Sequence, residues 1–209
     1  MKGLLLKDFY MAKKHLRAWI AMMLVFIGVA CVNAENMFFI FYPCMLSGMI
    51  PVSLLGYDER SKWDVYAGTL PCSKAQIVSA KYLIGLIVHG GVLLLTALTQ
   101  GIRMAMTASF LWSEYLALIG VLVMLGCIST AITLPFMFKF GVEKGRMAYY
   151  VMVALISGSS VALPKVLGKM LEQQVSFNGI LAVVVLVVIA LYILSWFLSI
   201  RFYEKRELK

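Results

Sequence analysis

The sequence has few charged side chains. Only 14% of its 209 residues are Asp, Glu, Lys or Arg, whereas a soluble globular domain carries about 25%. Hydrophobic residues make up 62% of the chain. The net charge of +9 does not indicate nucleic-acid binding, because basic loops on one side of a bilayer give a membrane protein the same excess. The composition therefore predicts an integral protein of the cell (plasma) membrane with no nucleic-acid partner.

Residues that carry catalytic or metal chemistry are also sparse. The four cysteines are scattered, and their spacing predicts neither a disulfide framework nor a zinc site. The two histidines, His15 and His89, have no carboxylate or cysteine at metal-ligand spacing. The chain also lacks the motifs of metalloproteases, serine hydrolases and phosphate-binding loops. We therefore expect no catalytic residue, no metal site and no cofactor bound by this chain.

Six charge-free runs approach or exceed the ~20 residues that cross a bilayer. They are residues 18–34, 36–57, 82–102, 115–138, 147–164 and 173–200. The sequence therefore predicts an all-α integral membrane protein with six transmembrane helices, in one domain that spans residues 1–209.

Two shorter segments are predicted to lie along the membrane surface. In residues 1–17, Leu5, Phe9 and Ala12 share one helical face and lysines lie opposite, which is typical of an interfacial helix. The alternative is a frayed basic terminus that only sets topology. Residues 163–177 predict a short amphipathic helix on the outer side, with an ordinary loop as the alternative.

Polar and small residues within the runs predict helix contacts. His89 lies in the third run, where a polar side chain is a candidate functional residue. A hydrogen bond from His89 to a neighbouring helix is the simpler alternative. Glycines at 85, 90 and 91 would allow close helix approach, although glycine is common in membrane helices.

Trp196 and Tyr203 flank the inner end of the last run, as interfacial aromatics do.

Basic residues are distributed unevenly between the two sides. With the N-terminus inside, 16 of the 19 Lys and Arg residues fall in inner segments, and only Arg103, Lys165 and Lys169 fall outside. This positive-inside pattern predicts that both termini and residues 57–81 are cytoplasmic.

Residues 57–81 form the longest polar interval and carry seven charged residues. Trp63, Tyr66, Ala67 and Leu70 follow helical spacing, and a proline then ends that helix. Ser73 and Gln76 form a capping box that predicts the start of the next helix. An ordered helix, stop and restart predicts a docking surface for a partner protein. The alternative is that the two aromatic residues hold the helix in the headgroup region.

The lack of charged residues within the runs argues against ion-coupled transport. No charged residue lies in the middle of any run, whereas proton-coupled transporters need such residues as relays. If the protein moves a solute uphill, a separate ATPase that contacts the cytoplasmic interval would supply the energy.

The pattern Trp63-x-x-Tyr66-x-x-x-Leu70-Pro71-x-Ser73, followed by Gln76-Ile77 and Lys81-Tyr82, resembles the permease subunits of ABC-2 family exporters. Among these it is similar to the permeases of phenol-soluble modulin exporters in Gram-positive bacteria. The resemblance covers the span count and loop layout of the whole chain.

The resemblance implies a permease that is surrounded by membrane lipids and pairs with a second permease copy or paralogue. It would work with an ATP-binding cassette ATPase, and that partner would bind ATP and Mg. Residues 57–70 of the cytoplasmic segment would form one helix, the coupling helix between spans two and three. The cargo would be an amphipathic peptide or another lipophilic molecule. The implied coupling residues are Asp58, Glu59, Arg60, Trp63, Asp64, Tyr66 and Leu70. The alternative is a non-transporting immunity or sensor subunit that binds partners through the same segment.

Overall fold

All the elements of the described structure are helices. The computed structural model describes residues 2–15, 17–32, 37–106, 111–145 and 177–205, together with Met147, Tyr150, Val151 and Ala154. The helices are α1 (Lys2–His15), α2 (Arg17–Val32), α3 (Met37–Arg60), α4 (Trp63–Ala67), α5 (Lys74–Met106), α6 (Trp112–Phe140) and α8 (Phe177–Lys205). The all-α prediction is confirmed for these residues.

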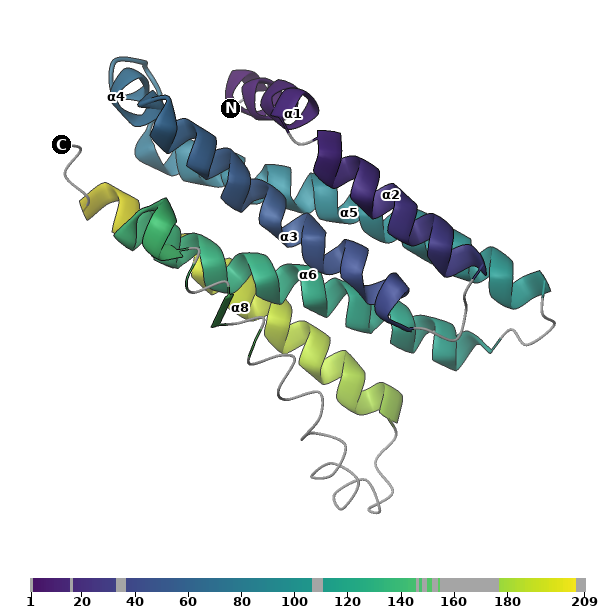
Figure 1. The fold of residues 1–209 in the computed structure, drawn as a ribbon. Coiled ribbons are helices and arrows are strands. Elements are labelled where there is room, and N and C mark those ends of the chain that lie inside the picture. The colour runs from purple at the N-terminus through teal and green to yellow at the C-terminus, as the bar shows by residue number, and fades with distance from the viewer. Residues whose placement is uncertain are drawn as a thin grey trace.

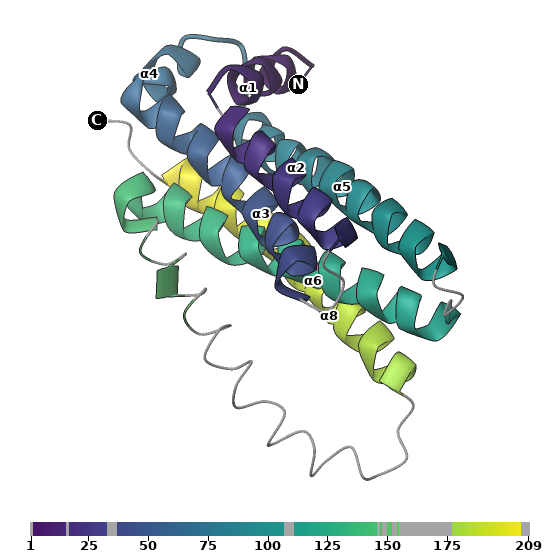
Figure 2. The same ribbon diagram turned by 45° about the vertical axis from the view of Figure 1, so that its right-hand side comes forward.

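The long helices run alongside one another as a bundle (Figure 1). Helix α3 packs against α2, α5 and α6, and α8 packs mainly against α6. Helices α1 and α4 lie at one end of the bundle, together with the C-terminal end of α8, as Figure 2 also shows. We call this the α4 end.

Four described helices are long and apolar enough to cross a membrane: Phe38–Arg60, Lys74–Met106, Trp112–Phe140 and Val183–Lys205. They correspond to the second, third, fourth and sixth predicted runs. The first predicted run corresponds to α2, an apolar helix with 16 described residues, and residues 33–36 after it lie outside the described structure. The predicted run 147–164 and the predicted outer helix 163–177 lie almost entirely outside the described residues.

The start of α5 is set by the predicted capping box. The Ser73 hydroxyl accepts a hydrogen bond from the backbone N–H of Gln76 (3.2 Å), and the backbone N–H of Ser73 donates to the Gln76 side-chain oxygen (3.3 Å). Each side chain thus satisfies a backbone donor that the first turn of a helix leaves without a partner. This confirms the restart predicted after residue 71.

Replacing Ser73 with alanine should lower stability by about 1 kcal/mol, because the N-cap acceptor is lost. Thermal unfolding of the purified protein would measure this. Thr69→Ala is the matched control, since the exposed Thr69 hydroxyl only donates to the Tyr66 carbonyl oxygen (2.8 Å). A shift for Ser73→Ala no larger than for Thr69→Ala would contradict the capping role.

The buried face of α1 differs from the predicted one. Leu4, Asp8 and Ala12 are buried, whereas Phe9 is 55% exposed. The buried face therefore contains Leu4 and Asp8 in place of the predicted Leu5 and Phe9, which shifts it by about one residue, and it shares Ala12 with the predicted face. The physical reason is the carboxylate of Asp8, which points into the bundle toward a buried lysine.

The aromatic residues near the end of α8 are packed inside the bundle. The Trp196 ring stacks on the Tyr82 ring (5.5 Å between centroids), and its indole N–H donates to the Ser79 hydroxyl (3.0 Å). Tyr203 is 3% exposed and contacts the ring of Phe138. The prediction that Trp196 and Tyr203 are interfacial aromatics is therefore wrong for Tyr203 and incomplete for Trp196, because both side chains join α8 to neighbouring helices.

Small residues bring α3, α5 and α6 into close contact. A Cβ added at Gly126 of α6 would overlap the His89 ring of α5, and one added at Gly48 of α3 would overlap the Ser129 side chain. The prediction of close approach holds for Gly85, where an added Cβ would lie 3.3 Å from the Pro51 ring. It does not hold at positions 90 and 91, where an added Cβ meets no atom within 4 Å.

Candidate functional site

The chain reverses between α3 and α4 through a tight turn. The backbone N–H of Ser61 donates to the Tyr57 carbonyl oxygen (3.0 Å), which continues the last turn of α3. Lys62 then adopts a φ of 54°, in the left-handed region that non-glycine residues rarely occupy. This residue ends α3 and directs the chain into α4.

Helix α4 has one side against the bundle and one side exposed. Ala67 is 1% exposed, and Trp63 packs against the same apolar core. Val65 and Tyr66 are 59% and 57% exposed on the other side. The two aromatic rings of α4 contact each other, with centroids 5.3 Å apart.

The predicted continuous helix over 57–70 is wrong in one respect, because the turn at Ser61 and Lys62 divides it into the end of α3 and the short α4. The four residues of the predicted apolar face are consequently separated. Trp63 and Ala67 face the bundle, Tyr66 faces outward, and Leu70 lies beyond the end of α4.

The charged residues predicted around this face have different environments. Asp58 is 1% exposed, whereas Glu59 and Arg60 are exposed. The Glu59 carboxylate accepts a hydrogen bond from the backbone N–H of Val142 (2.9 Å), which joins the end of α3 to the turn after α6. Asp64 lies within α4, and its side chain is outside the described structure. Asp58 is therefore not one of the exposed charged residues around this face.

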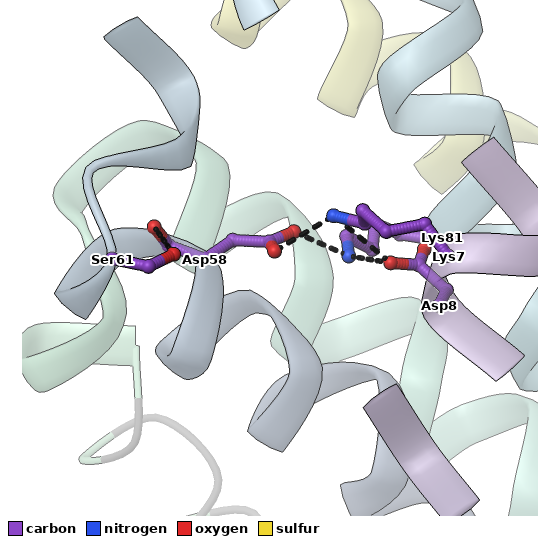
Figure 3. Close-up of polar contacts among 5 residues, drawn as sticks. All are labelled: Lys7, Asp8, Asp58, Ser61 and Lys81. Atoms are coloured by element: carbon purple, nitrogen blue, oxygen red, sulfur yellow. Dashed lines mark hydrogen bonds and ion pairs between the residues drawn. The ribbon is translucent and has the colours of Figure 1, made fainter. Parts of the chain in front are cut away.

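Asp58 belongs instead to a buried cluster of four charged side chains, which Figure 3 shows. We call Lys7, Asp8, Asp58 and Lys81 the four-charge cluster. The Lys81 ammonium lies 2.7 Å from the Asp8 carboxylate and 2.5 Å from the Asp58 carboxylate. The Lys7 ammonium lies 2.7 Å from Asp58 and 3.2 Å from Asp8. Two positive and two negative groups therefore alternate, and the formal charges cancel.

Three of these side chains are almost fully removed from solvent. The exposed fractions of the Asp8, Asp58 and Lys81 side chains are 1%, 2% and 2%, and that of Lys7 is 22%. An isolated charge in such a place carries a desolvation penalty of several kcal/mol, which close opposite charges offset. The cluster therefore requires α1, α3 and α5 to meet in one arrangement.

Lys7 also links this cluster to α4. Its ammonium lies 4.1 Å from the centroid of the Trp63 ring, within the range of a cation–π interaction. The same ammonium pairs with Asp58. Lys7 thus joins the N-terminal helix to both the end of α3 and the start of α4.

No pattern in the sequence predicts a role for Lys7, Asp8 or Lys81 within this site. The contacts join residues that are separated by 51 and by 73 positions in the sequence, so local spacing could not predict them. One feature of the sequence does indicate an unusual role for Asp8. Asp8 is the single acidic residue in a helix rich in lysine, and an acidic residue there is unfavourable for binding anionic headgroups.

His89 provides a second polar contact, deeper in the bundle. Its ring Nδ1 lies 2.8 Å from the Ser47 hydroxyl, which itself donates to the Cys44 carbonyl oxygen (2.6 Å). Because that hydroxyl has only one proton, Nδ1 carries the proton and donates to Ser47. The contact joins α5 to α3, as the simpler interpretation of His89 predicted. Among the described residues no group of His, Cys, Asp and Glu could hold a metal ion.

Comparison with family models matches residues 3–204 to the model described as ABC-2 family transporter protein. Comparisons with curated proteins and with solved structures give no match. The family consists of membrane permeases of ABC transporters, which are not catalytic themselves and work with an ATP-binding cassette ATPase. The match covers nearly the whole chain, and the apolar helices agree with a multi-pass membrane protein. The chain therefore belongs to the ABC-2 family of transporter proteins.

Proposed function

We propose that this chain is the permease subunit of an ATP-driven exporter, and that the segment from Asp58 to Leu70 couples it to the ATPase. The observation that carries the proposal is the exposure of Val65 and Tyr66 on a helix whose other side is fixed to the bundle. A fixed helix with exposed apolar side chains loses little conformational entropy on binding, and aromatic residues often dominate such contacts.

The distribution of basic residues supports a cytoplasmic α4 end. The described Lys and Arg residues other than Arg103 come from α1, the start of α2, the segment from the end of α3 to the start of α5, the end of α6 with the residues just after it, and the end of α8. These elements meet at the α4 end (Figure 1). By the positive-inside rule this end, with both termini, faces the cytoplasm, where an ATPase and its ATP and Mg are available.

The structure suggests a division of roles within the coupling segment. Tyr66 and Val65 would contact the ATPase, with exposed Arg60 and Glu59 nearby. Trp63 would hold α4 in place through the core and through Lys7. Asp58 would act from inside, by fixing the end of α3 in the four-charge cluster.

Tyr66→Ala should weaken the association between the permease and its ATPase by roughly 30-fold, which corresponds to the ~2 kcal/mol of a typical aromatic hot spot. The measurement is co-purification with the ATPase, together with the change in ATPase rate on adding the permease. Tyr10→Ala is the matched control, because Tyr10 is 61% exposed and lies on α1 rather than α4.

Equal loss of binding in the Tyr10 and Tyr66 variants would contradict the assignment of α4 as the contact.

The cargo, which we propose to be an amphipathic peptide or another lipophilic molecule, requires a second assay. ATP-dependent movement of such a peptide by the assembled complex in liposomes is the expected result. Assembly without movement would support the alternative of an immunity or sensor subunit.

A further inference from the structure

An apolar groove of about 560 Å³ lies between α1, α2 and α5, and Ile50 of α3 also lines it. Its lining is apolar apart from one residue, Lys13 of α1. The apolar walls include Ile20 and Ile27 of α2 and Ile87 and Leu95 of α5. Figure 2 shows α2 and α5 side by side, with α1 across their ends.

The groove has the dimensions of one half of a bilayer. From Ile87 to Leu95 a helix rises about 12 Å, and from Ile20 to Ile27 it rises about 10 Å, at 1.5 Å per residue. Half of the hydrocarbon core of a bilayer is about 15 Å thick. A hollow that begins at the surface helix α1 and continues for this distance matches the path of an acyl chain in one leaflet.

The charge at the groove entrance is positive. Lys13 lines the groove, and the side chains of Lys14 and Arg17 beside it are exposed. The Arg17 side chain donates to the Lys13 carbonyl oxygen (3.0 Å), which holds it near the entrance. Asp8, the acidic residue of α1, is buried and paired with lysines, so it does not offset this charge.

We propose that this groove binds an anionic phospholipid, with its phosphate at Lys13 and one acyl chain between α2 and α5. The argument rests on the joint presence of an apolar channel and a basic entrance. A zwitterionic lipid would fill the same channel but gain less from the basic residues. The proposal requires membrane insertion and does not depend on ATPase coupling.

Gly91 offers a way to close the groove without disturbing the fold. It lines the groove, and an added Cβ there would meet no atom within 4 Å. A Gly91→Leu side chain would therefore occupy the channel. Gly90→Leu is the matched control, because the neighbouring position is equally open but does not line the groove.

The experiment is native mass spectrometry of the purified full-length chain with phosphatidylglycerol or phosphatidylcholine of identical acyl chains. We expect one tightly held phosphatidylglycerol, and a preference over phosphatidylcholine that falls roughly fivefold in Lys13→Gln, the effect of one basic residue near a charged headgroup. Gly91→Leu should reduce binding of both lipids, whereas Gly90→Leu and Arg201→Gln, on α8, should change neither.

Two results would overturn the proposal. One is equal binding of the two lipids by the unmodified protein. The other is unchanged lipid binding by Gly91→Leu, and if that variant also loses a dimer mass, the groove is an interface between two copies of the chain. Loss of ATPase binding by Tyr66→Ala leaves the lipid result unaffected, so the two proposals fail separately.

Discussion

Lys81→Met should destabilise the protein by roughly 3–5 kcal/mol, the usual result of removing one member of a buried ion pair. The variant leaves the Asp8 and Asp58 carboxylates buried with only Lys7 to balance them. For a chain of this size the expected fall in melting temperature is roughly 6–20 °C, at 2–4 °C per kcal/mol. Thermal unfolding in detergent, followed by tryptophan fluorescence, would measure it.

A double variant separates charge balance from loss of packing. Asp8→Asn together with Lys81→Met leaves the Lys7–Asp58 pair at 2.7 Å and keeps the charges equal. It should therefore be less destabilised than the sum of the two single variants. Lys144→Met, at an exposed lysine, should shift stability by no more than about 0.5 kcal/mol. A melting temperature for Lys81→Met close to that of Lys144→Met would rule out a structural role for the cluster.

Gly126→Ala should destabilise the protein by roughly 1–3 kcal/mol, because the added methyl group overlaps the His89 ring and forces α5 and α6 apart. On intrinsic helix propensity alone the change would be favourable, since alanine exceeds glycine by about 1 kcal/mol in a helix. The sign of the measured change in melting temperature therefore distinguishes packing from propensity.

Two variants complete this test. Gly90→Ala, where the added methyl group meets no neighbour, should be neutral or slightly stabilising. Adding His89→Ala to Gly126→Ala should restore part of the stability, because the smaller side chain vacates the space that the methyl group needs. If the double variant is no more stable than Gly126→Ala, the ring is not the obstacle.

The features that the sequence predicted well depend on local physics. The Ser73–Gln76 capping box is formed by residues three positions apart, and both of its hydrogen bonds are present. The long apolar runs predicted the helices because bilayer thickness fixes their length.

The missed features depend on contacts between distant residues. A carboxylate on the apolar side of α1 appears unfavourable until Lys81 of α5 is placed beside it. The break between α3 and α4 occurs at Lys62, where no glycine or proline marks it. The inward position of Trp63 follows from the core beneath α4 and from Lys7 above its ring. Helical spacing alone could not distinguish such an inward face from a docking face.

The close contacts at Gly48, Gly85 and Gly126 constrain where the proposed cargo could cross. Side chains of the neighbouring helices fill the space beside these glycines, so the contacts leave no room for a peptide between α3, α5 and α6. We therefore expect a passage for the proposed cargo to run along an outer face of these three helices. Its other wall would come from elements outside them, such as the proposed second permease copy or paralogue.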